Sequence, residues 1–500
     1  MDNKKFKLTS NEKSANGPLT GDISLYQKEL HGCESLPTPG YYPALNSAEI
    51  ADSERSGLYP FATFLGSFEG PNKVYAWRSE DIYETASFIN NRKPGELFIT
   101  GGVIPDLKGP IAPGPFIAKA DATTGKQIWK TYLWNANLSD KWLATTNLNL
   151  LSNGLIVTSW SNQIALLDPD TGLILKTNTL PVGTTPEADV SFKHLTVAPD
   201  GTLILKNQSR PTGSKDQSSK AIFTGIKKGL KQGNSIIVAV NPDSLEVIDQ
   251  IQMSEPATTP HVITMYEDKI AIYISADKNA YRYFWNPNSK KLSQDISWKV
   301  SYLSEGQTTG DAPGVMGDYI VIQTNGIGGK VASSIVAISQ KDQKKMTTIF
   351  PFGKLKKLQM SLAPPKSGTD IENNMVYSAD AGVGKVAGIK LDQDTGKLEA
   401  AFVIDCCTLA FQPLIGPKDK RVLILSNMKT NIPIEPTLLG LKFGNYKEQV
   451  TWRDALTGRL LAESDFFEPL TIGSLMTPGY GGRIYFPTEN GFITFQVMPE

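Results

Sequence analysis

The stretch Asp121-Ala122-Thr123-Thr124-Gly125 contains a phrase, an aspartate followed three residues later by Thr-Gly, that decides the fold because it recurs along the chain. Further copies occupy residues 168–172, 392–396 and 454–458, and each lies between two apolar or alternating runs. The aspartate can accept hydrogen bonds from backbone N–H groups two residues on, and the glycine can adopt a positive φ. Each copy therefore predicts a hairpin turn, and a recurring hairpin indicates a propeller or a solenoid.

Eroded copies of the same turn fill the gaps, at residues 241–244, 286–289 and 340–343. The seven turns begin at residues 121, 168, 241, 286, 340, 392 and 454, and the interval from 168 to 241 is the longest, at 73 residues. Because a four-stranded blade takes about 40 to 50 residues, this interval predicts an insertion. Residues 207–234 are its predicted location, since they are rich in Lys, Ser, Gly and Gln and lack the alternation of a strand.

The two ends of the chain predict how the repeat closes. Residues 483–487 and 492–497 supply strands for an eighth unit that has no outer strand, and residues 74–77 could complete it. We therefore predict an all-β fold, an eight-bladed β-propeller over residues 61–500 that is closed by N- and C-terminal strands, with seven blades as the alternative. Residues 1–60 are predicted to form an irregular extension that packs along the propeller.

The segment around the first turn resembles a known repeat. Residues 120–129 are similar to the repeat of the pyrroloquinoline quinone (PQQ)-type propellers, the quinoprotein alcohol dehydrogenase-like superfamily. In that family a closing tryptophan docks one blade on the next. Only Trp129 keeps this position, which is Lys176, Ala400 and Ala462 in the other intact copies. The chain thus resembles a degenerate member of a superfamily that contains both dehydrogenases that bind PQQ and calcium and scaffolds that bind neither.

Composition limits the partners and the location. Fifty basic and fifty acidic side chains cancel, so no global field would recruit nucleic acid or anionic lipid. The sequence contains no run of 18 apolar residues, the length that a membrane-spanning helix needs. Residues 1–13 are polar and basic and lack the apolar core of a signal peptide, so the protein is either cytosolic or lost a signal before this sequence begins. The family resemblance implies a periplasmic or extracellular protein.

Aligning the blades on their first turn predicts a ring of polar residues where the inner strands begin, at the mouth of the central channel. Its members, from the second blade to the eighth, are Asn147, His194, His261, Asp311, Ser367, Gln412 and Ser474. Imidazoles and a carboxylate can bind a metal ion, and histidine can act as a general acid or base. Two alternatives stay open: the ring is only hydrated, or a one-residue shift of the alignment turns both histidines into the blade interior.

Cys406 and Cys407 are adjacent, in a predicted loop after the sixth blade. A vicinal cysteine pair lies beside the cofactor in many PQQ dehydrogenases, so the resemblance implies a redox-active or gating pair. The position differs, because the cysteine pair of those enzymes lies early in the chain. Two ordinary buried thiols are the alternative. The resemblance also makes Trp142 and Glu187 candidates for the surroundings of PQQ and calcium.

Functions from different classes follow. We favour a noncatalytic propeller that acts as a binding or scaffold module for a protein, glycan or small ligand, because the repeat is eroded and no complete catalytic motif is present. The alternative is a quinoprotein-type oxidoreductase that depends on PQQ and calcium, with Asp311 as the candidate base and Asn147 as a candidate calcium ligand. A lyase or transferase that uses His194 and His261 is a third option.

Overall fold

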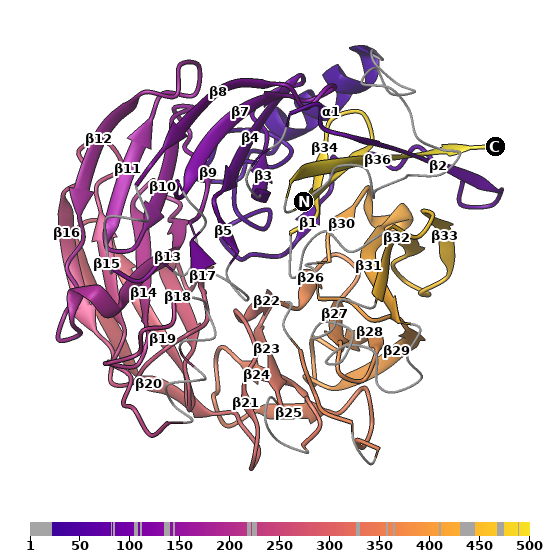
Figure 1. Ribbon diagram of the computed structural model, residues 1–500. Coiled ribbons are helices and arrows are strands. Elements are labelled where there is room, and N and C mark those ends of the chain that lie inside the picture. Colours follow the sequence, from indigo (N-terminus) through magenta and orange to yellow (C-terminus); the bar gives the residue numbers. More distant parts are fainter. Residues whose placement is uncertain are drawn as a thin grey trace.

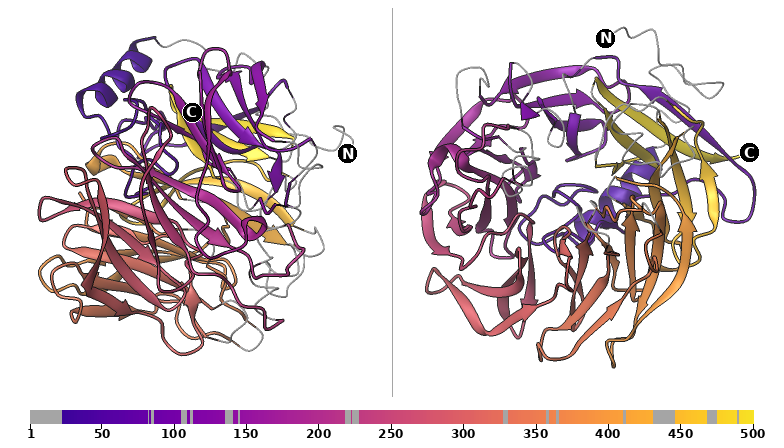
Figure 2. Two further views of the ribbon diagram at one scale, coloured as in Figure 1. Left: turned by 90° about the vertical axis from the view of Figure 1, so that its left-hand side faces the viewer. Right: turned by 60° about the horizontal axis from the view of Figure 1, so that its bottom comes forward.

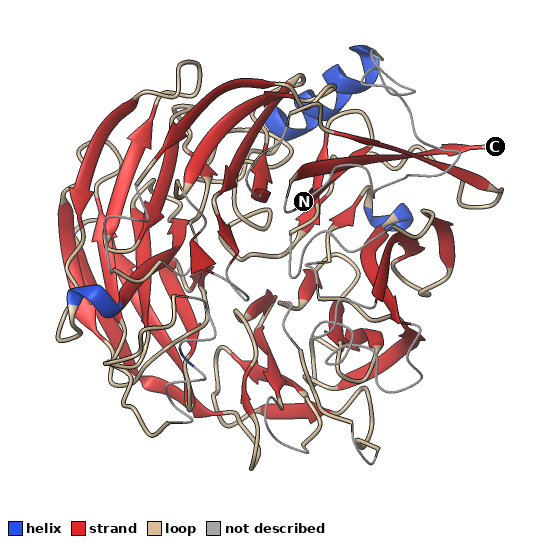
Figure 3. Ribbon diagram, in the orientation of Figure 1, coloured by secondary structure: helices blue, strands red, loops and turns tan. Residues whose placement is uncertain are grey.

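In the computed structural model the chain forms a ring of eight β-sheets, a β-propeller whose blades surround a central channel (Figures 1 and 2). Strands dominate the described part of the chain (Figure 3). The predicted eight-bladed propeller is confirmed, and the seven-bladed alternative is wrong. The structure describes residues 23–81, 83, 86–104, 109–110, 113–134, 141–143, 146–217, 222, 228–326, 331–356, 359–363, 366–409, 412–430, 446–467, 475–488 and 490–500.

The first four blades follow one another along the chain, each with strands in sequence order from the channel outward. Blade 1 consists of β3 (Ala86–Asn90), β4 (Glu96–Gly101), β7 (Phe116–Asp121) and β8 (Gln127–Tyr132), with a small hairpin of β5 (Val103–Ile104) and β6 (Gly109–Pro110). Blade 2 consists of β9 (Asn149–Leu150), β10 (Ile156–Trp160), β11 (Gln163–Leu167) and β12 (Ile174–Thr179). Blade 3 consists of β13 (Val190–Val197), β14 (Leu203–Ser209), β15 (Ile236–Val240) and β16 (Val247–Gln252). Blade 4 consists of β17 (His261–Tyr266), β18 (Lys269–Ser275), β19 (Asn279–Asn286) and β20 (Lys291–Ser301).

The next three blades repeat this order. Blade 5 consists of β21 (Thr308–Thr309), β22 (Gly314–Met316), β23 (Tyr319–Asn325), β24 (Ile335–Ser339) and β25 (Met346–Ile349). Blade 6 consists of β26 (Gly368–Asp370), β27 (Met375–Asp380), β28 (Lys385–Leu391) and β29 (Leu398–Asp405). Blade 7 consists of β30 (Leu414–Ile415), β31 (Val422–Thr430), β32 (Tyr446–Asp454) and β33 (Leu460–Glu463), and the N-terminal strand β1 (Leu58–Tyr59) pairs with β30 in parallel.

Blade 8 closes the ring with strands from both ends of the chain. Its inner strands are β34 (Thr477–Gly479), β35 (Arg483–Thr488) and β36 (Gly491–Pro499), and its outer strand is β2 (Asn72–Arg78). Strand β2 runs antiparallel to β36 without a break in register, from Asn72 opposite Pro499 to Arg78 opposite Ile493. The predicted closure by N- and C-terminal strands is therefore confirmed.

The repeated turn has the predicted geometry. The Oδ1 atom of Asp121 accepts hydrogen bonds from the N–H groups of Thr123 and Thr124, at 2.9 and 2.7 Å, and Gly125 has a φ of 71°. The eroded turns keep this geometry with other residues. The Oδ1 atom of Asn241 accepts two backbone N–H groups in the same way, and Leu245 takes the position of the glycine at a φ of 62°.

Trp129 docks blade 1 on blade 2, as the family repeat implies. Its Nε1 donates to the carbonyl of Pro169 at 3.3 Å, and its ring lies against Gly172. Within the described residues three other tryptophans bond to a neighbouring blade, although none has the position that the repeat predicts. Trp77 of β2 donates to Thr123 of blade 1, Trp285 of β19 donates to Asp200 of blade 3, and Trp298 of β20 donates to Ser339 of blade 5, all at 3.0 Å.

Buried apolar side chains fill every space between neighbouring blades. One cluster joins blades 3 and 4 through Ile204 and Ile272, and corresponding clusters join the other seven pairs. Because side chains alternate along a strand, Leu203 and Leu205 of the same strand face blade 2 instead. The same alternation determines which residues of an inner strand face the channel and which face a neighbouring blade.

Two segments lie outside the blades. Strand β14 extends to Ser209 and β15 begins at Ile236, so the insertion of blade 3 starts three residues later than predicted, because Asn207, Gln208 and Ser209 are buried in the strand. The N-terminal extension contains helix α1 (Ile23–Ser35), where the sequence indicated no regular structure, and then enters the ring. Within the described residues no helix is long and apolar enough to cross a membrane.

Candidate functional site

Residues 46–57, which we call the plug, lie inside the ring against the inner strands (Figure 2). None of these residues is exposed. They form hydrogen bonds with the inner strands of six blades, or with residues next to them, through the following contacts: Asn46 to Ile89, Glu49 to Asn149, Ser53 to Val197 and Ile263, Ser56 to Thr369, and Gly57 to Leu414. The N-terminal extension is thus part of the channel.

The plug has a strained backbone. Ile50, Ala51 and Arg55 have φ values of 61°, 73° and 54°, in the left-handed region that non-glycine residues avoid. Such residues cost about 1 to 3 kcal/mol each, and they persist only where the surroundings hold them. Bonds such as Ser53 Oγ to the carbonyl of Val197, at 2.6 Å, provide that hold.

Six charged residues of the plug and the inner blade segments influence one another, and we call them the channel cluster: Asp52, Glu54, Arg55, Lys193, Asp311 and Lys366. Burial raises the pKa of Asp311, while the N–H of Ala312 and the charges of Lys193, Arg55 and Lys366 act in the opposite direction. None of these three cations lies within 4.0 Å of the Asp311 carboxylate, because the described residues form no such ion pair.

Burial also shifts the pKa values of Asp52, Glu54 and Lys366. Burial raises the pKa of Asp52, and it raises that of Glu54 to about 7, with the neighbouring charge of Asp52 acting in the same direction. Burial also lowers the pKa of Lys366 to about 8, although Asp52 and Asp311 oppose the shift. The cluster therefore contains groups that change charge near neutral pH.

The two histidines of the predicted ring do not open into the channel. His194 and His261 are 1% and 0% exposed, and neither ring nitrogen of either has a hydrogen-bond partner within the described residues. His194 lies opposite Lys206 in the β13–β14 ladder, so both side chains face blade 4, as Ile204 does. Burial, with the charges of Lys206 and Arg55, holds both imidazole pKa values well below the usual range. The structure thus has the arrangement that the shifted alignment described.

The other ring members are divided between structural bonds and the channel. The Asn147 amide donates to Ser159 Oγ at 2.5 Å and to the carbonyl of Lys193 at 3.2 Å, and its Oδ1 accepts from Ser159 N–H at 3.1 Å. Ser367 is buried and donates to Gln323. Gln412 is buried, and neither atom of its amide has a partner among the residues that the structure describes. Ser474 lies outside the described residues.

Trp142 and Glu187, which the family resemblance suggested for a cofactor site, form structural contacts instead. Trp142 is fully buried and packs against Ile222 of the blade 3 insertion. Glu187, in the short 3₁₀ helix η3 (Glu187–Asp189), pairs with Lys141. Neither residue belongs to the channel cluster.

Within the described residues neither Cys406 nor Cys407 forms a disulfide, and both are buried in different parts of the core. Cys406 packs among blade 6 and blade 7 residues, with its Sγ 3.4 Å from the carbonyl of Ser426. Cys407 packs with Leu409 and Met428, with its Sγ 3.5 Å from the carbonyl of Ala381. Burial raises the pKa of the Cys406 thiol to about 12. Such a thiol is a poor nucleophile at neutral pH.

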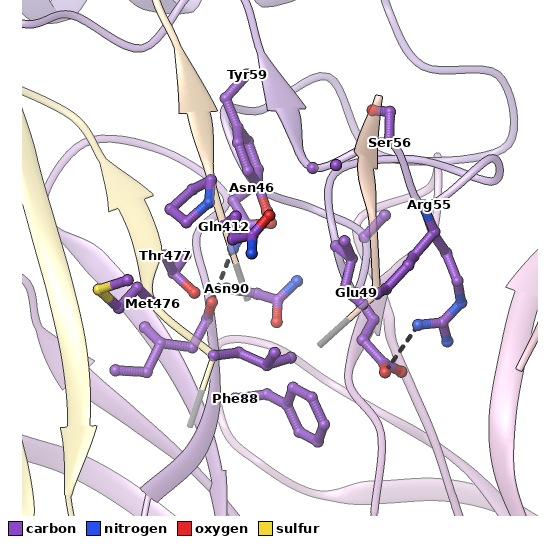
Figure 4. Close-up of a pocket in the computed structure, with 18 of the residues that line it drawn as sticks. Asn46, Glu49, Arg55, Ser56, Tyr59, Phe88, Asn90, Gln412, Met476 and Thr477 are labelled. Carbon is purple, nitrogen blue, oxygen red and sulfur yellow. Dashed lines mark hydrogen bonds and ion pairs between the residues drawn. The ribbon is translucent and has the colours of Figure 1, made fainter. Parts of the chain in front are cut away.

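A pocket lies between the plug and the inner strands of blades 1, 6, 7 and 8 (Figure 4). Arg55 and Glu49 form an ion pair on one side, with Arg55 Nη1 3.0 Å from Glu49 Oε1, and Met476 and Thr477 lie on the other side. Asn46, Asn90, Lys366 and Gln412 supply further polar groups. The volume that the centre of a water molecule can reach is about 20 Å³, so the pocket is small.

Sequence reasoning missed most of these channel residues. The plug was assigned to an extension outside the channel, and nothing in its composition places Asp52, Glu54 or Arg55 among blades that follow much later in the chain. Lys193 and Lys366 were missed by one position, because the alignment selected His194 and Ser367. The change of strand face with each residue was the available signal.

Comparison with known proteins supports the fold. No protein-family model matches the chain, and no curated protein matches its sequence. The solved quinohemoprotein alcohol dehydrogenase from Comamonas testosteroni is similar, with a TM-score of 0.56 and 9% identity, over 95% of this chain and 85% of that chain. Quinohemoprotein alcohol dehydrogenase ADHIIG from Pseudomonas putida HK5 has a TM-score of 0.46 and 10% identity, over 94% of this chain and 81% of that chain. BamB from Moraxella catarrhalis has a TM-score of 0.44 and 12% identity, over 84% of this chain and 97% of that chain. At 9% identity the likeness to the Comamonas testosteroni structure shows the architecture alone.

The residues present do not fit the PQQ and calcium that the fold family implies. The amide of Asn147 is used by Ser159 and Lys193, and Trp142 is covered by the insertion. Among the residues that the structure describes, no three His, Cys, Asp or Glu side chains are grouped so that they could hold a metal ion. We therefore derive no chemical step through either group.

Proposed function

We propose that this protein is a noncatalytic propeller that acts as a binding or scaffold module, with a protein as its partner. The plug is the observation that carries the proposal. Asp52, Glu54 and Arg55 of the plug supply half of the channel cluster, so the chain fills its own channel end with side chains that a cofactor site would need to leave free. Recognition is then a property of the outer surfaces.

The surface best built for recognition is the part of blades 2 and 3 that we call the platform, the described residues 141–143, 186–189, 210–217, 222 and 228–235. A buried ion pair anchors it, since Arg210 Nε lies 2.7 Å from Asp189 Oδ1. Arg210 also donates to the carbonyls of Ala188 and Asp216, and the N–H of Trp142 donates to Ala188. In blade 3 the platform lies at the start of β13 and the plug lies at its end.

The exposed charges of the platform favour an acidic partner surface. Lys215, Lys228 and Lys231 are exposed, on a loop whose base is fixed by Arg210. Complementary charge speeds association. A glycan or a small ligand remains within the broader proposal, at the same face.

Thermal unfolding with and without PQQ plus Ca²⁺ tests the noncatalytic part of the proposal. A ligand that binds only the folded state at 100 times its dissociation constant stabilises it by about 2.7 kcal/mol. We expect no shift of the midpoint at saturating cofactor. A clear upward shift that Asp311→Ala abolishes would instead support the quinoprotein-type oxidoreductase.

Charge reversal tests the platform. Partners are captured by cross-linking from the native source, identified, purified and titrated against the protein. We expect Lys215→Glu, Lys228→Glu and Lys231→Glu together to weaken binding at least tenfold, whereas a matched control, Lys126→Glu, Lys390→Glu and Lys397→Glu, changes three exposed lysines elsewhere and should not. Equal affinity of both triple variants would refute the platform as the binding surface.

A further inference from the structure

The pocket beneath the plug contains more buried polar groups than its own bonds satisfy. Among the side chains that line it, four nitrogens have no hydrogen-bond partner in the described part of the chain: Arg55 Nε, Arg55 Nη2, Asn90 Nδ2 and Gln412 Nε2. Three oxygens are also without partners: Asn46 Oδ1, Glu49 Oε2 and Gln412 Oε1. A buried polar group without a partner destabilises the folded state, so a ligand that satisfies it is favoured.

Hydrogen-bond donors are in excess. Arg55 and Lys366 have no acceptor atoms, and Lys366 Nζ has one bond, to the carbonyl of Ser367 at 2.8 Å, with two N–H groups left. Both atoms of the Gln412 amide lack a partner, so the amide can present either end whichever way it is oriented. The species that would best satisfy this lining is therefore one that only accepts hydrogen bonds.

The charge of the lining has the same implication. Its charged residues are Glu49, Arg55 and Lys366, and the first two form an ion pair with each other. Lys366 is 2% exposed and has no carboxylate within 4.0 Å. Asp52 and Asp311 influence it only from a greater distance, and both oxygens of Asp52 already accept bonds from Ser56. One buried positive charge is thus left without a contact partner.

The size of the pocket limits the ligand. A cavity needs about 10 to 15 Å³ of such volume to hold one water molecule, and this pocket offers about 20 Å³. A cofactor, a sugar or an amino acid does not fit. A single ion, or a molecule of about three atoms, does.

We propose that the pocket is a binding site for a small monovalent anion, of the size of chloride or formate, which lies between Lys366 and Gln412. The anion balances the charge of Lys366 and accepts hydrogen bonds from the ammonium and amide groups. Since Lys366 and Gln412 belong to blades 6 and 7, while Asn46 and Arg55 belong to the plug, the ion joins the plug to the ring. The site is independent of the platform and of the partner that binds there.

Anion-dependent stability tests the site. The protein is dialysed into sodium gluconate, whose anion is too large to enter, and sodium chloride, bromide or formate replaces it at constant ionic strength. We expect the thermal midpoint to rise and saturate with each small anion. Lys366→Gln should remove this rise. Lys193→Gln, which removes a channel cation that does not line the pocket, should retain it.

Two results would overturn the proposal: a midpoint that does not depend on the anion, or a rise that Lys366→Gln retains in full. If Lys366→Gln does not fold, anomalous diffraction from crystals of the unmodified protein grown in bromide tests the site instead. An anomalous peak within hydrogen-bond reach of Lys366 Nζ is the expected result. A peak confined to surface lysines would contradict the site and would indicate general salt effects.

Discussion

Replacing Gly172 by alanine tests how the blades are held together. Gly172 has a φ of 74°, and a Cβ atom there would lie 2.5 Å from Trp129 Cε3 and 3.0 Å from Thr131 Oγ1. Alanine in the left-handed region costs about 1 to 2 kcal/mol. Overpacking against a fixed side chain adds about 1 to 3 kcal/mol. We therefore expect Gly172→Ala to lower the free energy of unfolding by about 2 to 5 kcal/mol.

Gly201 provides the matched control. It has a φ of 88°, and a Cβ atom there would meet no atom within 4 Å. Gly201→Ala should therefore cost only the backbone term, about 1 to 2 kcal/mol. Urea unfolding followed by tryptophan fluorescence and by far-ultraviolet circular dichroism gives the midpoints, and the two probes together show whether the transition is two-state.

A double-mutant cycle isolates the docking term. In a Trp129→Ala background the contact with the ring is absent and only the 3.0 Å approach to Thr131 Oγ1 is left, so the cost of Gly172→Ala should fall towards that of Gly201→Ala. The reasoning fails if Gly172→Ala and Gly201→Ala lower the midpoint equally. It also fails if removing the Trp129 ring leaves the full cost of Gly172→Ala in place.

Three further changes can be measured in the same way. Lys290 is exposed at a φ of 54°, so Lys290→Gly should stabilise the protein by up to about 1 kcal/mol, and a loss of stability would show that the side chain is needed. Arg421 and Asp370 form a fully buried ion pair at 2.9 Å, so Arg421→Met should cost about 3 to 5 kcal/mol, and an unchanged urea midpoint would contradict that estimate. Burial raises the pKa of Glu448 to about 8, so its contribution to stability is complete below the usual value of about 4.3 and is lost as the pH rises through 8. Glu448→Gln should remove this part of the pH dependence, which midpoints at about pH 5 and pH 9 would reveal.

The fold could be predicted because its information is local. The side chain of Asp121 and the φ of Gly125 define a turn within five residues, and the turn recurs where the intact phrase does not. Asn241 and Leu245 reproduce the geometry without the aspartate or the glycine. Local hydrogen bonding therefore survives substitutions that erase the motif, and the spacing of turns remains readable.

The site could not be predicted to the same extent, because it depends on contacts between distant segments. Asn46 bonds with Ile89, 43 residues away, and Ser56 bonds with Thr369, which is more than 300 residues away. No periodicity leads from one to the other. At the inner strands the error was smaller but decisive, since one residue separates Lys193, which faces the channel cluster, from His194, which faces blade 4. A polar residue at the start of an inner strand has a face only when the register is known.

The plug and strand β2 together account for how a ring with distant ends can close. Asn72 and Pro499 pair although they are 427 residues apart, and closing a flexible loop of that length costs about 5 kcal/mol. The plug reduces this cost in stages, because Asn46 reaches blade 1 over 43 residues and Glu49 reaches blade 2 over 100. Once Gly57 is bound to Leu414 of blade 7, β2 begins only 15 residues further on and lies next to the position it must fill. The plug is therefore expected to form before the last blade closes, and its strained residues are held by bonds that the ring itself supplies.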